Sequence, residues 1–254
     1  MRRFSALKFK LVFVLFTLII TLNFFLPEKV TIFLVGDSTM AIKTPDDEPE
    51  KGWGQVFVEF FNDRVNIENH ARNGRSTKSF FNEGLWKKVV DRIKPGDYVL
   101  IQFGHNDSKI ADTSRYAEAN TTYRNNLRKF VNDVRNKSGS PILITPVNRR
   151  KFVESGNFID QHGDYPGVVR EVALEMNVPL IDLHASSLKL FSKVGAEETK
   201  KIFLHVKPGI YKKYPDGKED DTHFNGYGAM VIAGLVVDDI KNQNLQLSEF
   251  LIEK

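Results

Sequence analysis

The chain has 254 residues and is 41% apolar, which is enough to bury one globular core. Four of its basic residues and none of its acidic ones lie in residues 1–26, so the remainder carries 32 charges of each sign. This neutral balance indicates no polyanionic partner such as a nucleic acid. The absence of cysteine excludes disulfides, a thiol nucleophile and cysteine metal sites.

Residues 1–28 are expected to be a signal anchor or a signal peptide. Arg2, Arg3, Lys8 and Lys10 precede an uncharged apolar run at 11–26, whose length lies between those of a cleaved signal and a spanning helix. No small-x-small cleavage site precedes Pro27, which favours an uncleaved anchor. The charge asymmetry predicts a domain at 29–254 outside the cytoplasm, or secreted if the segment is cleaved. A buried core helix is disfavoured because the run is apolar on every face.

Short apolar runs alternate with helical stretches through the rest of the chain. Runs that are apolar on both faces suit a parallel sheet covered by helices. Strands are predicted at 30–35, 65–68, 98–103, 141–145 and 178–183. Helices are predicted at 54–62, 83–93, 114–136, 165–176 and 226–243. This alternation predicts a three-layer α/β/α sandwich, with long surface loops at 43–51 and 207–221.

Ser38 follows the first predicted strand and comes two residues after Gly36, which permits a sharp turn. In a parallel α/β sheet this position opens onto the crevice at the carboxyl ends of the strands. A serine hydroxyl needs a base to become a nucleophile, and without partners Ser38 would be a helix cap or a turn residue.

The partners of a serine nucleophile are present near the end of the chain, in Asp220-Asp221-Thr222-His223. His223 can act as the base, and Asp220, three residues earlier, can orient its imidazole in a tight turn. Asp221 is a rival for the carboxylate role. The alternative is an acidic loop followed by a helix cap.

An acyl-transfer site also needs hydrogen-bond donors for the developing oxyanion. Gly74 follows the second predicted strand and can offer its backbone N–H, while Asn106 follows the third and can offer its side-chain amide. Each has a simpler explanation as a turn or loop residue. Their position after successive strands predicts that both lie beside Ser38.

These motifs resemble those of the SGNH/GDSL hydrolases over residues 30–240. Within that superfamily, the sequence is most similar to the rhamnogalacturonan acetylesterases. The resemblance to the acetylesterases rests on the segments 36–40, 52–55, 74–77 and 102–107, and on Thr145-Pro146 with Arg149-Arg150. The resemblance implies a flavodoxin-like fold with a five-stranded parallel sheet. It also implies Ser38 as nucleophile, His223 as base, Asp220 as orienter, and an oxyanion hole made by Ser38, Gly74 and Asn106.

Five further residues are candidates for substrate contact. Trp53 lies between two glycines and could floor a sugar site, although a core position is the alternative. Guanidinium groups match uronate carboxylates, so Arg75, Arg149 and Arg150 could bind a pectic polymer, with a solvated surface role as the alternative. His105 adjoins Asn106 and is expected to shape the site wall.

No cofactor is expected. His70, His162, His184 and His205 show no metal-ligand spacing, and no glycine-rich phosphate loop follows any strand. The sequence therefore predicts a serine esterase that deacetylates plant cell-wall polysaccharide, with rhamnogalacturonan as the first choice. The alternatives are a xylan-directed or lipase-like esterase and, in another class, a catalytically silent carbohydrate-binding module tethered to a membrane.

Overall fold

The computed structural model describes residues 29–252. The expected membrane segment at 1–28 lies outside these residues. Within 29–252, no helix is both long enough and apolar enough to cross a bilayer.

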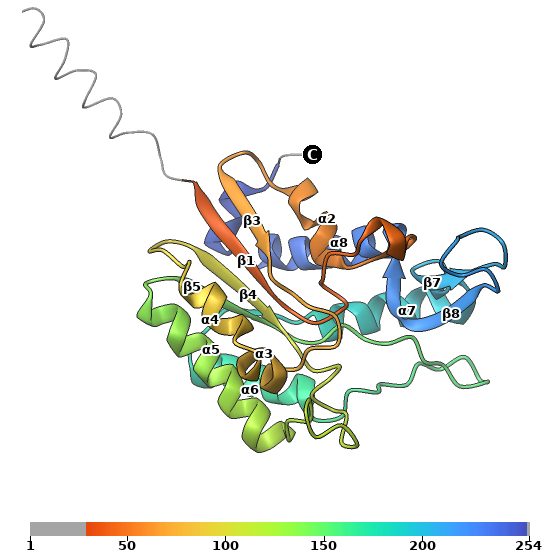
Figure 1. Cartoon of the computed structure of the whole chain (residues 1–254), viewed down its shortest axis with the longest axis horizontal. Coiled ribbons are helices and arrows are strands. Elements are labelled where there is room, and N and C mark those ends of the chain that lie inside the picture. The colour runs from red at the N-terminus through yellow and green to blue at the C-terminus, as the bar shows by residue number, and fades with distance from the viewer. Residues whose placement is uncertain (1–28, 253–254) are drawn as a thin grey trace, which may run out of the picture.

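A five-stranded parallel sheet forms the centre of the domain (Figure 1). Its strand order is β3-β1-β4-β5-β6, which is the flavodoxin-like order, and it confirms the predicted fold. The central strands read as apolar runs because both of their faces are covered. The strands are β1 (Val30–Gly36), β3 (Val65–Asn69), β4 (Tyr98–Gln102), β5 (Ser140–Ile144) and β6 (Leu180–Ile181).

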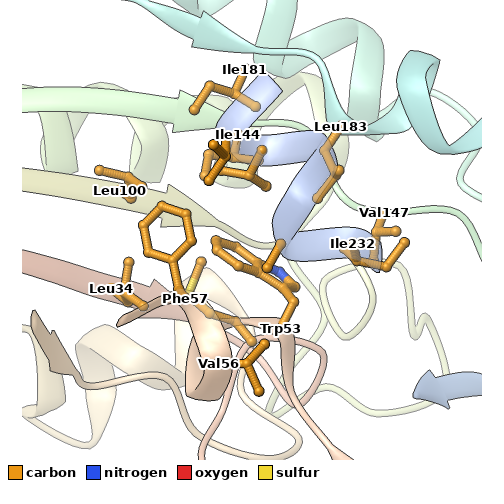
Figure 2. Packing of buried hydrophobic residues seen from close by; sticks show 14 of the residues in the cluster. Leu34, Trp53, Val56, Phe57, Leu100, Ile144, Val147, Ile181, Leu183 and Ile232 are labelled. Atoms are coloured by element: carbon orange, nitrogen blue, oxygen red, sulfur yellow. The ribbon is translucent and has the colours of Figure 1, made fainter. Parts of the chain in front are cut away.

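Helices cover both faces of the sheet and bury two separate apolar clusters. On one face, Leu34 and Leu100 from the sheet pack with Trp53 and Ile232 from two helices, as Figure 2 shows. That face carries α2 (Trp53–Val56), α7 (Leu183–Thr199) and α8 (Gly226–Asn242). The other carries α3 (Thr77–Asn82), α4 (Leu85–Val90), α5 (Arg124–Asn136) and α6 (Tyr165–Glu175).

Several helix boundaries differ from the prediction. The helices α3 and α7 were not predicted, and the expected helix at 114–136 begins as the π-helical turn Ala119–Tyr123 before α5. Gly84 lies between α3 and α4 and has φ of 68°, which breaks the helical path of the backbone. Glycine suits this position because an L side chain rarely adopts that conformation. Shorter 3₁₀ turns are η1 (Pro45–Asp47), η2 (Phe57–Phe60) and η4 (Gln246–Phe250).

A small antiparallel sheet of order β2-β8-β7 lies beside the main sheet. It consists of β2 (Glu50–Lys51), β7 (Phe203–Val206) and β8 (Lys218–Asn225). The two expected surface loops are therefore partly strand, which corrects the prediction for 43–51 and 207–221. The strand β8 is rich in charged residues and leads directly into α8. Its pairing with β2 and β7 and its junction with α8 fix the position of its side chains.

Candidate active site

Ser38 lies in the tight turn that ends β1. The turn is closed by the carbonyl of Asp37, which accepts hydrogen bonds from the N–H groups of Met40 and Ala41 at 3.3 and 3.1 Å. Gly36 is required just before it, because a Cβ there would lie 2.6 Å from the carbonyl oxygen of Gln102 on β4. The close approach of the two strands thus sets the position of the Ser38 hydroxyl at the sheet edge.

The structure brings His223 and Asp220 to this serine, although 185 positions separate Ser38 and His223 in the sequence. The Nε2 atom of His223 lies 2.9 Å from the Ser38 Oγ. The Nδ1 atom of His223 lies 3.0 Å from Asp220 Oδ2. The three side chains therefore form a continuous hydrogen-bonded chain, with the order that a serine hydrolase requires.

Asp220 is held as a carboxylate. Burial would raise its pKa, but the hydrogen bond and charge of His223, together with the N–H groups of His223 and Thr222, outweigh burial and hold the pKa of Asp220 well below its usual range. The neighbouring Asp221 has other partners, since its Oδ1 lies 2.7 Å from His205 Nε2 and 3.0 Å from Arg150 Nη1.

The predicted oxyanion donors lie at the ends of neighbouring strands. Gly74 has φ of 74°, a left-handed conformation that suits glycine, in the turn after β3. Among residues 29–252, no group accepts a hydrogen bond from the backbone N–H of Ser38 or of Gly74. Asn106 is 3% exposed, and its Nδ2 donates to the Arg75 carbonyl at 3.0 Å. Two backbone donors are thus uncommitted, and the amide is fixed beside the turn that holds Gly74.

Asp37 and His105 support the serine turn from below. One carboxylate oxygen of Asp37 accepts from the Thr39 N–H and hydroxyl, and the other lies 3.1 Å from His105 Nδ1. Burial raises the pKa of Asp37, but the charge and hydrogen bond of His105 outweigh it and lower the pKa to about 2. Burial also lowers the pKa of His105, despite the opposing effect of Asp37. His105 is 3% exposed, so it holds the turn from behind the site surface.

Asp107 is a buried residue that supports this region, and the sequence did not single it out. Its Oδ1 accepts hydrogen bonds from the Thr77 N–H and hydroxyl, so it ties the segment after β4 to the start of α3. Burial raises the pKa of Asp107 to about 7. Its position next to Asn106 was the one feature of the sequence that could have indicated a role. The sequence alone did not show that its side chain is buried.

Two of the predicted substrate contacts are corrected. Trp53 is fully buried, and its Nε1 donates to Gln102 Oε1 at 2.7 Å, so it packs in the core and cannot floor a sugar site. Arg150 donates to the carbonyl of Ala196 and to Asp221, so its guanidinium ties the loop after β5 to α7 and β8. These contacts commit Arg150 to structure.

Arg75 and Arg149 remain near the site. Arg149 is half-buried and donates to the His105 carbonyl at 2.9 Å, while Arg75 pairs with Glu83 at 2.9 Å. Arg75 lines a pocket of about 690 Å³ that adjoins Gly74. Apart from Gly74, the residues that line it have amide, hydroxyl or charged side chains: Asn73, Arg75, Ser79, Asn82, Glu83, Asp112, Ser114 and Arg115.

A second polar cluster brings together two histidines for which the sequence showed no metal-ligand spacing. Ligand atoms of Asp160, His162 and His184 lie within 4.8 Å of one another. However, Arg170, which can only donate, lies 3.3 Å from His184 Nδ1. The Nε2 atom of His184 lies 3.1 Å from Asp160 Oδ1. This arrangement is a hydrogen-bonded polar cluster that packs against His105 through His162.

Comparison with known proteins agrees with this geometry. Residues 34–230 match the GDSL-like Lipase/Acylhydrolase family, and the chain belongs to that family. It is similar to the rhamnogalacturonan acetylesterase RhgT of Bacillus subtilis, with 40% identity over 89% of this chain and 96% of the relative. It is also similar to a rhamnogalacturonan acetylesterase of Emericella nidulans, with 29% identity over 87% of this chain and 89% of the relative.

Solved structures show the same fold. The YxiM protein of Bacillus subtilis superposes with a TM-score of 0.74 at 27% identity, over 85% of this chain and 57% of the longer relative. An acetylxylan esterase from Geobacillus stearothermophilus superposes with a TM-score of 0.57 at 17% identity, over 85% of this chain and 96% of the relative. The protein is thus a carboxylic ester hydrolase of the GDSL type.

Proposed function

We propose that the protein is a carbohydrate acetylesterase that removes O-acetyl groups from rhamnogalacturonan. The observation that carries the proposal is the chain of hydrogen bonds from Ser38 through His223 to Asp220, at 2.9 and 3.0 Å. The substrate choice rests on the relatives named as rhamnogalacturonan acetylesterases, one of them 40% identical over most of both chains.

In the first step, the Ser38 Oγ attacks the acetyl carbonyl carbon while His223 Nε2 takes the hydroxyl proton. The tetrahedral intermediate collapses as the C–O bond to the sugar breaks, and His223 returns the proton to the sugar oxygen. This leaves an acetyl group on Ser38. Asp220 stays ionised throughout, orients the ring through Nδ1 and stabilises the imidazolium.

In the second step, a water molecule loses a proton to His223 and attacks the acetyl carbon on Ser38. The bond to the Ser38 Oγ breaks, the serine regains its proton, and acetic acid leaves as acetate. In both steps the carbonyl oxygen becomes an oxyanion, which the N–H groups of Ser38 and Gly74 and the amide of Asn106 would stabilise. Each such donor is typically worth about 100-fold to 1,000-fold in rate.

The pocket beside Gly74 supports a sugar over a lipid. An acyl channel for a long chain would be apolar, whereas this lining consists of amides, hydroxyls and charged groups. Arg75 and Arg115 also line this pocket, but they pair there with Glu83 and Asp112, so their guanidinium groups do not distinguish a galacturonate-containing backbone from a neutral one. Xylan carries the same ester chemistry, so it stays the runner-up substrate.

We also propose that the protein works outside the cytoplasm, anchored by residues 1–28 or released after their cleavage. The support is the sequence of that segment, in which basic residues precede a long apolar run. A polymer of the plant cell wall is too large to enter a cell, which fits an exported enzyme.

The test of the substrate is acetate release by the full chain from acetylated rhamnogalacturonan, acetylated xylan and a neutral aryl acetate. We expect the pectic polymer to give the highest kcat/KM, and Ser38→Ala to lower every rate by at least about 1,000-fold. A preference for xylan would replace the proposed substrate. Hydrolysis of the aryl acetate but of neither polymer would show an esterase with another natural substrate. No release from any substrate by folded protein would support the binding module.

A further inference from the structure

Lys109 contacts a proposed oxyanion donor, although it is absent from the motif that carries that donor. Its Nζ lies 2.9 Å from Asn106 Oδ1 and donates to it, and its backbone N–H donates to the Asn106 carbonyl at 3.2 Å. The second bond closes a turn from Asn106 to Lys109. The side chain of Lys109 is thus directed at Asn106 by the local backbone.

This contact decides which way the Asn106 amide points. The oxygen and nitrogen of an amide have nearly the same size, so packing does not distinguish the two orientations. An ammonium can only donate and a carbonyl can only accept, so Lys109 requires Oδ1 on its side and the Arg75 carbonyl requires Nδ2 on the other. With one N–H on Arg75, the second N–H of Asn106 remains for a substrate oxygen.

We propose that Lys109 is a positioning residue for ester hydrolysis, which fixes and polarises the Asn106 amide as an oxyanion donor. The proposal rests on the proposed function. A charge-assisted hydrogen bond to Oδ1 draws electron density from the amide nitrogen, which makes the remaining N–H a stronger donor. The oxyanion forms in the transition states and tetrahedral intermediates and is absent from the bound ester, so the contribution of Lys109 belongs in kcat and not in KM.

The surroundings of Lys109 also offer another role, which the test must separate. Lys109 is exposed and near Arg115 and Arg149, and partial desolvation together with the charges of these arginines lowers its pKa. A cation in such a place could instead bind a carboxylate of the polymer. That role would change KM for an acidic polymer and would leave hydrolysis of a small neutral ester unchanged.

The test measures kcat and KM of the full chain with Lys109→Met and Lys109→Arg, on a neutral aryl acetate and on acetylated rhamnogalacturonan. We expect Lys109→Met to lower kcat by about 10-fold on both substrates, less than loss of the donor itself, with KM changed less than twofold. Lys109→Arg should recover most of kcat because it keeps a charged donor. Lys87→Met is the matched control, since the exposed Lys87 donates through its Nζ to Asp91 Oδ2 at 2.6 Å, a contact that involves no residue of the site, and it should change neither constant.

A double-mutant cycle tests whether Lys109 acts through Asn106. In an Asn106→Ala background, Lys109→Met should lower kcat no further, because the amide it positions is gone. An equal 10-fold loss in that background would overturn the proposal, as would unchanged kcat in the single variant. A change confined to KM for the polymer would make Lys109 a substrate contact. Because the aryl acetate reports on Lys109 whatever the natural polymer is, failure on rhamnogalacturonan alone would overturn the substrate proposal and leave this one standing.

Discussion

Asp220 and Asp221 show how one step along a strand decides the contacts of a side chain. Asp220 turns back to the imidazole of His223, whereas Asp221 pairs with His205 and Arg150. The two residues have the same chemistry and adjacent positions, but only one lies against the ring that contacts Ser38. They therefore form a natural pair for testing the orienting role.

We expect Asp220→Asn to lower kcat by about 1,000-fold or more, because an amide would favour the wrong tautomer of His223 and would not stabilise the imidazolium. Asp221→Asn should lower kcat less than about fivefold, and it should cost about 1 kcal/mol of stability through weaker contacts with Arg150. Kinetics on an aryl acetate together with urea unfolding of both variants provide the check. The reverse ranking in kcat would show that Asp221 orients the base.

At the residue scale, the sequence predicted that Ser38, Gly74 and Asn106 follow the ends of successive strands. The roles of Trp53 and Arg150 could not be predicted, because they depend on burial and on partners far along the chain. Trp53 reaches Gln102 on β4, and Arg150 reaches α7 and β8. Lys109 was missed because an exposed lysine after a motif has no sequence signal that distinguishes it from a solvated one.

At the scale of elements, α8 helps to position His223 because it follows β8 without a break. Asn225 caps the helix by accepting a hydrogen bond from the Gly228 N–H at 2.9 Å. Gly228 packs against the chain before β7, where an added Cβ would lie 1.8 Å from the Ile202 carbonyl oxygen. The start of α8 is thus fitted closely against the segment that leads into the small sheet.

This packing predicts opposite effects for alanine at two glycines of α8. Gly228→Ala should lower the free energy of unfolding by about 3 kcal/mol, because the clash with Ile202 must displace backbone. Gly234 has no neighbouring atom within 4 Å of an added Cβ, so Gly234→Ala should raise stability by up to about 1 kcal/mol through helix propensity. Urea unfolding of the full chain measures both. Equal effects of the two substitutions would contradict the close fit at Gly228.

Element prediction succeeded where burial leaves a local pattern. The strands β1, β4 and β5 are apolar on both faces, so their sequences mark them directly. The strand β8 reads Lys-Glu-Asp-Asp-Thr-His-Phe-Asn and forms through pairing with β7, a contact that no local pattern indicates. The helix α7 contains Gly195 with φ of 82°, and this interruption weakens its helical pattern.

At the scale of the whole molecule, the strand order explains why the residues of the candidate site lie at one edge of the sheet. Because β1 lies between β3 and β4, the segments that follow these three strands bring Ser38, Gly74 and Asn106 to neighbouring positions. The small sheet then carries Asp220 and His223 to the same edge from the other end of the chain. The alternating pattern predicted the parallel sheet, and the strand order came from the family resemblance, because no local property of a strand specifies its neighbours.

The central claim is that Ser38 is a nucleophile activated by His223, and covalent labelling tests it most directly. The full chain would be treated with a phosphonate ester that reacts with activated serines, and the modified residue would be located by peptide mass spectrometry. The account predicts one adduct per chain, on Ser38, with acetate release lost in proportion, and no labelling of His223→Ala. An adduct on another serine that abolishes activity, or acetate release that continues after Ser38 is fully modified, would contradict it.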